Sequence, residues 1–229
     1  MKSIAQNIQT VENDIAAFER LHDRIADSVT LIAASKTQSS ERIIQAYQAG
    51  IRHFGENYLQ EALEKKSQLI DEDIVWHFIG PIQSRKARDI AQHFDWVHSV
   101  DRLTVAEKLS RHRPSEMAAL QVCIQVNISN DPNKSGVSVD EIQSLAEQIQ
   151  QLPGLELRGL MTLPKAEPML AQQRTAFKQL TDQFKALQSS FPRIDTLSMG
   201  MTRDMEAAIA EGATFVRVGT AIFGAREPN

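Results

Sequence analysis

The sequence predicts an α/β fold, a single (β/α)8 barrel of the TIM type with an extra N-terminal helix. Short apolar runs alternate with helical segments along the chain, which is typical of βαβ units and a parallel sheet. About eight such runs occur, the number that a closed barrel requires. The last two end in glycine turns, where such barrels frequently build a phosphate site. The 229 residues are close to the roughly 250 that one barrel needs, so we expect residues 1–229 to form one domain.

The first segment is predicted to be an amphipathic helix that packs on the core. Apolar residues recur on one helical face, namely Ile4, Ile8, Val11, Ile15, Phe18 and Leu21. Acidic residues accompany them, so the segment has the composition of neither a signal peptide nor a transit peptide.

The remaining elements follow in alternation. Strands are predicted at residues 31–35, 51–54, 75–79, 96–100, 122–128, 157–161, 196–199 and 215–218. Helices are predicted at residues 40–48, 58–69, 84–93, 104–111, 139–151, 172–187 and 205–211. An open doubly wound sheet is the competing architecture, but it usually has fewer strands and a glycine-rich turn after the first one.

Composition limits the function classes. The formal net charge of −4 argues against electrostatic binding to nucleic acid or to an anionic membrane. The single cysteine, Cys123, excludes an internal disulfide, and no Cys/His cluster has zinc-ligand spacing. A reducing compartment fits this pattern, so we expect a cytoplasmic protein.

Lys36 ends the first predicted strand and precedes a polar turn. It therefore lies at the carboxyl end of a strand, on the face where barrels place their sites. Partial desolvation there would lower the pKa of its amine and allow a Schiff base with an aldehyde. A solvated turn lysine is the commoner situation. The phosphate turns at the other end of the sheet are what favour a functional lysine.

Two glycine turns near the C-terminus predict that phosphate site. One contains Ser198, Gly200 and Met201, the other contains Gly219 and Thr220, and each leads into the start of a helix. Glycine lets backbone amides approach a ligand, and the first amides of a helix favour an anion. The first and eighth strands of a closed barrel are neighbours, so Lys36 would share one mouth with the last turn. An amine facing a phosphate cup suits pyridoxal 5'-phosphate (PLP).

Arg217 lies in the last predicted strand with the same parity as Phe215, whereas Val216 and Val218 share the other face. If the valines pack outward on helices, Arg217 points into the barrel, where an unpaired charge would be costly. It would then either form a salt bridge across the interior or face the pyridine nitrogen of PLP. In the second case it would disfavour ring protonation and weaken the electron sink of the cofactor.

Other polar residues at strand ends are expected to line the mouth. They are Glu56, Asn57, Tyr58, Gln125 and Asn127. His77 lies within an apolar run, where a histidine is more often a hydrogen-bonded core residue than a catalyst. Lys134 could supply a second amine, although a loop lysine is usually solvated.

The chain resembles the pyridoxal phosphate homeostasis proteins from about the first strand to its last residues. The most specific segment is Trp76-His77-Phe78-Ile79-Gly80-Pro81-Ile82-Gln83-Ser84-Arg85-Lys86. It is accompanied by Ala34-Ser35-Lys36-Thr37, Phe54-Gly55-Glu56-Asn57-Tyr58, Leu160-Met161, Ser198-Met199-Gly200-Met201 and Val218-Gly219-Thr220-Ala221-Ile222-Phe223-Gly224.

The resemblance implies a monomeric or weakly associating barrel like the N-terminal domain of alanine racemase, with PLP held as an aldimine on Lys36. The phosphate would rest on Ser198, Gly200 and Met201 from one turn and on Gly219 and Thr220 from the other. Arg217 matches an arginine near the pyridine nitrogen, and Asn57 matches an asparagine at the mouth. His77 completes the candidate cofactor-binding residues. Members of the family are thought to buffer PLP and to influence vitamin B6 balance without firmly established catalysis, and PLP-dependent enzymes are candidate acceptors.

Two departures from the family pattern are visible. Thr202 replaces a serine and Arg203 adds a cation near the cup, which should preserve phosphate binding. Asp131 and Pro132 change the loop before Lys134, which leaves any role for that lysine open.

The alternative function is an amino-acid racemase or a related PLP-dependent lyase. Racemisation needs two bases, and in barrel racemases the second is a tyrosine of an appended β-domain. The sequence has only Tyr47 and Tyr58 and ends at Asn229, so we expect no such domain. A cofactor-free Schiff-base aldolase would need acid/base carboxylates beside a mid-barrel lysine, and that constellation is not evident.

Overall fold

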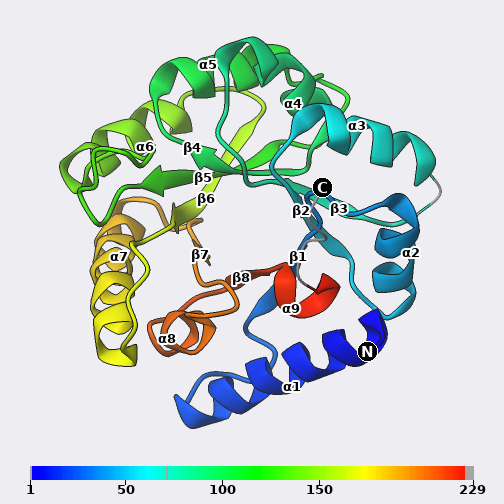
Figure 1. Cartoon of the computed structure of the whole chain (residues 1–229). Coiled ribbons are helices and arrows are strands. Elements are labelled where there is room, and N and C mark those ends of the chain that lie inside the picture. The colour runs from blue at the N-terminus through cyan, green and yellow to red at the C-terminus, as the bar shows by residue number, and fades with distance from the viewer. Residues whose placement is uncertain (1, 71, 225–229) are drawn as a thin grey trace.

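A computed structural model describes residues 2–70 and 72–224 and shows eight parallel strands closed into a barrel. Each strand pairs with the next along the chain and β8 pairs with β1, so the predicted TIM-type barrel is confirmed (Figure 1). The strands are β1 (Thr30–Ala34), β2 (His53–Glu56), β3 (Val75–Phe78), β4 (Trp96–Val100), β5 (Leu120–Val126), β6 (Leu155–Thr162), β7 (Thr196–Ser198) and β8 (Phe215–Val218).

Helices surround the barrel as an outer layer (Figure 1). They are α1 (Ile4–Leu21), α2 (Ser40–Gln48), α3 (Leu59–Gln68), α4 (Ala87–His93), α5 (Leu103–His112), α6 (Ile142–Gln150), α7 (Leu170–Ser190), α8 (Met205–Ala210) and α9 (Thr220–Phe223). The segments predicted as helices at 84–93 and 139–151 begin instead with single 3-10 turns, Ser84–Lys86 and Val139–Glu141. Among the described residues, no helix is long and apolar enough to cross a membrane.

Helix α1 covers the barrel beside the short helix α9. It starts with a capping box between Ser3 and Gln6, which satisfies two of its free amides. Asn7 ties it to α9 by donating to the carbonyl of Ile222 at 2.9 Å. The predicted apolar face was wrong at its last residue, because Leu21 is 64% exposed. Glu19 is buried instead, where it accepts hydrogen bonds from the chain entering β1.

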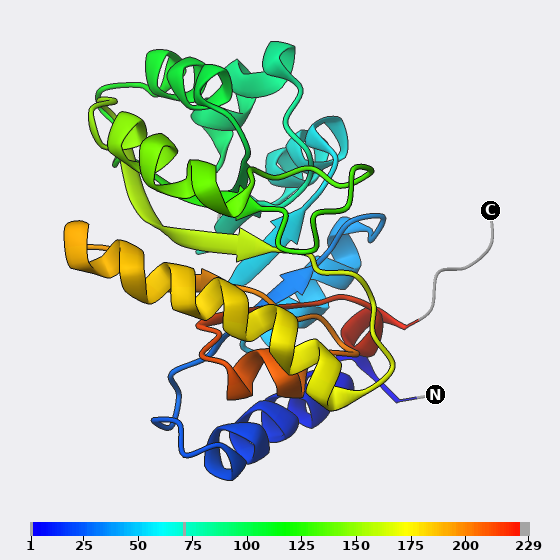
Figure 2. The same ribbon diagram turned by 90° about the vertical axis from the view of Figure 1, so that its left-hand side faces the viewer.

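The barrel interior is a separate core from the layer between strands and helices. Val216 and Val218 belong to the outer layer, whereas Phe215 packs inside the barrel, so the predicted parity of β8 is confirmed. The interior apolar cluster consists of Ile32, Trp96, Cys123, Met161 and Phe215. In Figure 2 the strands run toward the right, so the loops that follow them form the right-hand end of the molecule.

Candidate functional site

The mouth at the carboxyl ends of the strands brings Lys36 and the last glycine turn together. Ala33 pairs with Val218 between β1 and β8, and Lys36 and Gly219 follow shortly after these residues. A Cβ added at Gly219 would lie 3.1 Å from the carbonyl oxygen of Ala34, so glycine permits this close approach. Lys36 is half-buried. The predicted neighbourhood of Lys36 and the Gly219–Thr220 turn is thus present.

A buried ion pair holds the backbone on both sides of Lys36. Lys65 donates to the carbonyl of Ser35 at 2.8 Å and pairs with Glu56 at 2.8 Å. Lys65 also pairs with Glu61, which accepts a hydrogen bond from the amide of Thr37. Glu56 therefore lies beneath the mouth and does not line it as expected. Burial raises the pKa of Glu56, although Lys65 and Ser35 oppose that shift.

Sequence reasoning missed this ion-pair cluster. The only signal was the spacing of Glu61 and Lys65, four residues apart on α3, which usually indicates an exposed helical pair. The extension of β2 to Glu56, two residues beyond its predicted end, is what carries this carboxylate inward.

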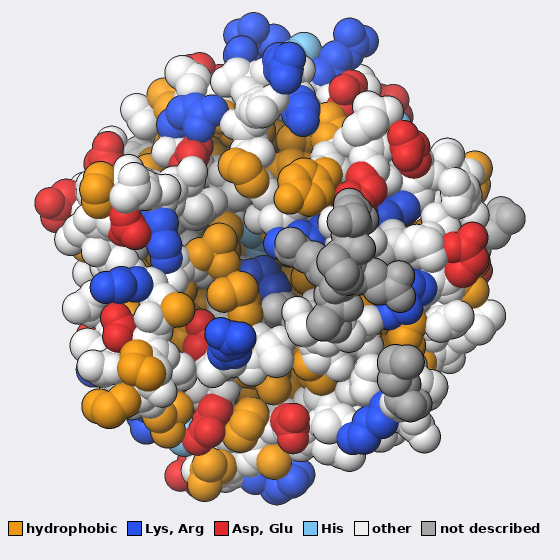
Figure 3. All heavy atoms as spheres, viewed as in Figure 1, with side chains coloured by type: hydrophobic (Ala, Val, Ile, Leu, Met, Phe, Trp, Pro, Cys, Tyr) orange, Lys and Arg blue, Asp and Glu red, His pale blue; other side chains and the backbone are white. Residues whose placement is uncertain are grey.

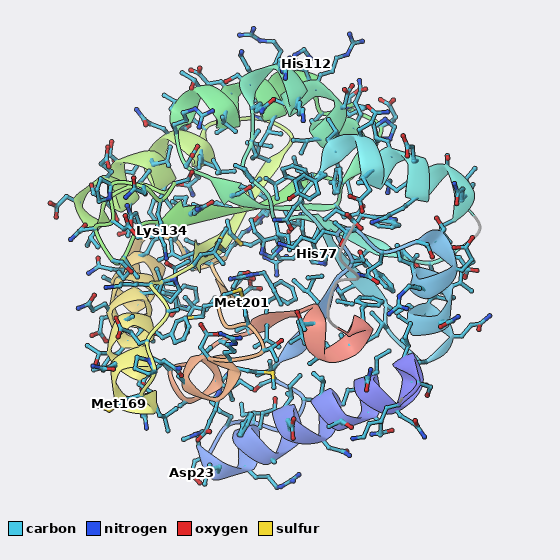
Figure 4. The ribbon with its side chains drawn as sticks, viewed as in Figure 1. Asp23, His77, His112, Lys134, Met169 and Met201 are labelled. Atoms are coloured by element: carbon cyan, nitrogen blue, oxygen red, sulfur yellow. The ribbon has the colours of Figure 1, made fainter. Side chains whose placement is uncertain are left out.

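The turn after β7 requires glycine at position 200. Gly200 has a φ of +95°, and a Cβ there would lie 2.5 Å from the Cβ of Ala208. The amide of Met201 donates to Asp204 at 2.6 Å, the residue that precedes α8. Burial raises the pKa of Asp204. Met201 itself is exposed and lies near the middle of the ring (Figure 4).

Arg217 points into the barrel and is 5% exposed. Its guanidinium donates to the hydroxyl of Ser198 at 2.6 Å and to the carbonyl of Thr162 at 2.9 Å. Among residues 2–70 and 72–224, no carboxylate lies within ion-pair distance of it. Burial lowers the pKa of Arg217 to about 10, so it remains charged at neutral pH. The salt bridge considered from the sequence is therefore absent among the residues that the structure describes.

Asn57 offers an unsatisfied acceptor next to β2. Its Oδ1 is buried and has no hydrogen-bond partner within the described part of the chain. Gly80 packs directly on this residue, since a Cβ at Gly80 would lie 2.7 Å from the Cα of Asn57. Buried polar atoms are almost always hydrogen-bonded, so this oxygen marks a position for a ligand or a water.

His77 lies inside the barrel, near the middle of the ring (Figure 4). Its Nε2 is 2.9 Å from His53 Nδ1, and its Nδ1 is 2.9 Å from His98 Nε2. His98 in turn contacts the Ser198 hydroxyl at 2.7 Å. Within the described residues, His77 is therefore linked to Ser198, in the predicted phosphate turn, through His98. Sequence reasoning missed His53 and His98, because an isolated histidine in a strand gives no signal of its partners.

The loop after β5 is held by its own polar residues. Asn127 donates to the carbonyls of Asp131 and Lys134, and Gln125 donates to that of Ser135. The Lys134 amine donates to the carbonyl of Leu163 at 2.9 Å. These contacts shape the rim of the mouth and tie Lys134 to the following loop.

Figure 3 shows this end of the molecule, with basic side chains in the hollow at the centre of the ring and hydrophobic side chains beside it. Across the described ranges, no group of three or more His, Cys, Asp or Glu side chains could hold a metal ion. The fold is a (β/α)8 barrel that carries Lys36 and two glycine turns after the ends of its strands and has Arg217 buried in its interior.

The alanine racemase N-terminal domain family matches residues 7–227. A pyridoxal phosphate homeostasis protein of Pseudomonas aeruginosa is 50% identical over 227 residues, covering 99% of this chain and 97% of the relative. Its counterpart in Escherichia coli is 46% identical over 230 residues, with 99% and 98% covered. The structure of PipY from Synechococcus elongatus with PLP bound is 38% identical and has a TM-score of 0.84, covering 97% of this chain and 100% of that one.

A more distant likeness extends to complete racemases. Alanine racemase of Clostridium difficile is 12% identical with a TM-score of 0.74, and the match covers 98% of this chain and 58% of the racemase. At that identity the likeness is one of fold. The chain belongs to the family of pyridoxal phosphate homeostasis proteins, which are barrels of the alanine racemase N-terminal type.

Proposed function

We propose that this barrel binds PLP at its mouth through Lys36 and so contributes to vitamin B6 homeostasis in the cell. The observation that carries this proposal is the placement of Lys36 beside the glycine turn after β8. The names of its relatives and the PLP bound to PipY support the same cofactor.

The residues present fit PLP in charge and in hydrogen bonding. The turns at Gly200 and Gly219 would receive the phosphate, with Ser198, Met201 and Thr220 belonging to the same two turns. The orphaned Oδ1 of Asn57 offers an acceptor to a polar group of the ring, and Arg217 supplies a buried cation. When bound, PLP supplies an aldehyde that an amine can attack and a pyridine ring that can withdraw electrons.

Three groups of the chain would then have separate roles in binding PLP. Lys36 attaches the cofactor through its amine, while the Lys65 cluster fixes the backbone that carries Lys36. Arg217 is held by Ser198 and Thr162 and stays charged, so it donates hydrogen bonds and cannot accept one. If Arg217 faces the pyridine nitrogen of bound PLP, its N–H groups would disfavour protonation of that nitrogen. Such a ring would withdraw electrons poorly, which suits a protein that stores PLP more than one that turns over substrates.

This proposal extends to partners and location. PLP-dependent enzymes are the acceptors that such a carrier would serve in the cytoplasm, and we propose a monomeric barrel that acts without nucleic acid or membrane. The likeness to racemases is one of fold, and we propose that neither tyrosine acts as a second base opposite Lys36. The Tyr47 hydroxyl accepts the amide of Asp73, and Tyr58 is exposed just before α3.

The test is titration of the purified protein with PLP, followed by borohydride reduction and peptide mapping. We expect a visible absorbance band and a label on Lys36. Lys36→Ala should remove the band while circular dichroism stays unchanged, whereas the control Lys134→Ala should keep it. A full band in Lys36→Ala, with the label on another lysine, would refute the assignment.

A further inference from the structure

Three histidine side chains form a continuous line of hydrogen bonds through the barrel interior. His53, at the start of β2, contacts His77 on β3 at 2.9 Å, and His77 contacts His98 on β4 at 2.9 Å. His98 contacts the hydroxyl of Ser198 at 2.7 Å, and the same hydroxyl accepts from Arg217 at 2.6 Å. The line therefore joins the amino end of β2 to the end of β7 at the predicted phosphate turn.

Aromatic rings fix the imidazoles in this line. Trp96 stacks on His77 with ring centroids 5.7 Å apart and planes 20° from parallel. Phe215 meets His77 edge-on at 5.5 Å and also packs on His53 and His98. Because this packing opposes rotation of the imidazole rings, each histidine keeps the same nitrogen atom in each hydrogen bond of the line.

The line has a direction because each imidazole has one hydrogen to share. His77 and His98 are completely buried, and burial lowers their pKa values well below 6.5, helped by neighbouring histidines and, for His98, by Arg217. Both are therefore neutral at neutral pH. A neutral imidazole carries one N–H, so each of these residues donates one hydrogen bond and accepts the other. The hydrogen bonds along the line then all have the same donor-to-acceptor direction.

Ser198 sets the direction of this line. Arginine can only donate, so Ser198 Oγ accepts from Arg217 and must place its own hydrogen elsewhere. Among the described residues, the acceptor that the structure gives this hydroxyl is His98 Nδ1. Ser198 therefore donates to His98, His98 to His77 and His77 to His53, and all three histidines carry their hydrogen on Nε2.

We propose that His53, His77 and His98 form a directional proton relay that couples protonation of His53 to the orientation of the Ser198 hydroxyl. In the protonated state the relay holds one additional proton. His53 then has hydrogens on both nitrogens, His77 and His98 carry theirs on Nδ1, and Ser198 accepts from His98. To reach this state, the Ser198 hydrogen moves to His98 Nδ1, the His98 hydrogen moves to His77 Nδ1, and the His77 hydrogen moves to His53 Nδ1. The added proton then binds to Ser198 Oγ and replaces the hydrogen that left it.

The two states offer different groups to a ligand. In the protonated state the Ser198 hydroxyl is released from His98 and can donate to an anionic oxygen that reaches this fully buried side chain. This step rests on the proposed function, in which Ser198 belongs to the turn that receives the PLP phosphate. Binding of that anion and protonation of His53 then favour each other, because coupling between two sites is reciprocal.

The charges around the relay favour placing its extra positive charge on His53, at the end far from Arg217. Burial lowers the pKa of His53, and Asp95 before β4 opposes that shift. The Arg217 charge acts against protonation of His98. In the same interior, the buried Cys123 remains a thiol because burial raises its pKa. Arg158 lies on the Trp96 ring and is paired with Asp195.

The first test reads the tautomers in the unliganded protein by long-range proton–nitrogen correlation in 15N-labelled samples. The sequence has 6 histidines, and the three outside the relay, His22, His93 and His112, serve as internal controls. His112 lies on the outer helix α5, far from His77 in the ring (Figure 4). We expect the hydrogen on Nε2 of His77 and His98 at neutral pH. A hydrogen on Nδ1 of either residue would overturn the relay.

The second test adds PLP or, separately, inorganic phosphate to the same samples. We expect the hydrogens of His77 and His98 to move to Nδ1 with PLP and the His53 pKa to rise. The affinity for PLP should then increase as pH falls, by about tenfold for each unit of that rise. His53→Gln should remove this pH dependence, and the control His112→Gln should keep it.

The two proposals fail in different ways. If no variant and no wild-type sample shows the absorbance of bound PLP, the proposed function fails, while the tautomers of the unliganded protein still decide the direction of the relay. If PLP binds without a tautomer change, or with the same pH dependence in His53→Gln, the relay is wrong. If His53→Gln does not fold, the tautomers and the His53 titration of the wild-type protein decide.

Discussion

The guanidinium of Arg217 donates to the hydroxyl of Ser198 at 2.6 Å inside the barrel. This contact joins β7 and β8, the two strands that end in the glycine turns, and holds a buried charge that has no carboxylate partner within residues 2–70 and 72–224. It makes Arg217 both a structural residue and the candidate partner of the pyridine nitrogen, and the two roles predict different results.

Arg217→Gln should shift the absorbance maximum of bound PLP, because a neutral side chain no longer opposes protonation of the ring nitrogen. It should also destabilise the fold by about 1–3 kcal/mol, since the Thr162 carbonyl loses its donor. Urea unfolding and the visible spectrum of the folded fraction measure the two effects separately. Destabilisation with an unchanged spectrum would assign Arg217 a structural role alone. Arg193→Gln, which removes an exposed guanidinium paired with Glu156, is the control for the spectrum.

Asn57→Ala should weaken PLP binding without destabilising the unliganded protein. The Oδ1 atom is buried without a partner in the described chain, and removing an unsatisfied acceptor recovers up to about 1–3 kcal/mol of desolvation cost. Thermal unfolding of the unliganded form and a PLP titration measure the two effects. If the affinity for PLP stays at the wild-type value, Asn57 is not part of the cofactor site.

Lys65→Met should cost about 3–5 kcal/mol, because it leaves the Glu56 carboxylate buried without its cation. It should also lower the affinity for PLP, since the Ser35 carbonyl next to Lys36 loses its donor. The control is Lys178→Met, which breaks an exposed pair with Asp182 and should cost less than about 0.5 kcal/mol. Equal losses of stability and of PLP affinity in the two variants would contradict the role of Lys65 in holding the backbone next to Lys36.

Stability should decline as the pH falls below about 6.5, in part through His77 and His98. Burial holds their pKa values in the folded barrel well below 6.5, whereas the unfolded chain binds these protons near that pH. Their contribution is therefore complete above 6.5 and is lost as the pH falls toward the folded pKa values, by about 1.4 kcal/mol per pH unit for each histidine. Urea unfolding between pH 5 and 7.5 measures the slope. His77→Gln should reduce it, while an unchanged slope would show that His77 is protonated in the folded state.

The sequence by itself determined the barrel and one part of the mouth. Alternation of apolar and helical segments is a local property, and closure makes the first and last strands neighbours, so the proximity of Lys36 and Gly219 followed from counting strands. The parity of β8 likewise placed Arg217 inside. Element ends were less exact, as β2 shows, because tertiary pairing with β1 and β3 extends it to Glu56.

Only the tertiary structure decided which polar groups meet inside the barrel. His53, His77 and His98 lie on three different strands, and their contacts depend on the stagger between those strands and on which face each residue occupies. The same holds for Lys65, whose side chain extends from α3 to pair with Glu56 at the end of β2. Burial of a polar side chain is costly unless such partners converge, and convergence is a property of the closed barrel that no single segment of the sequence contains.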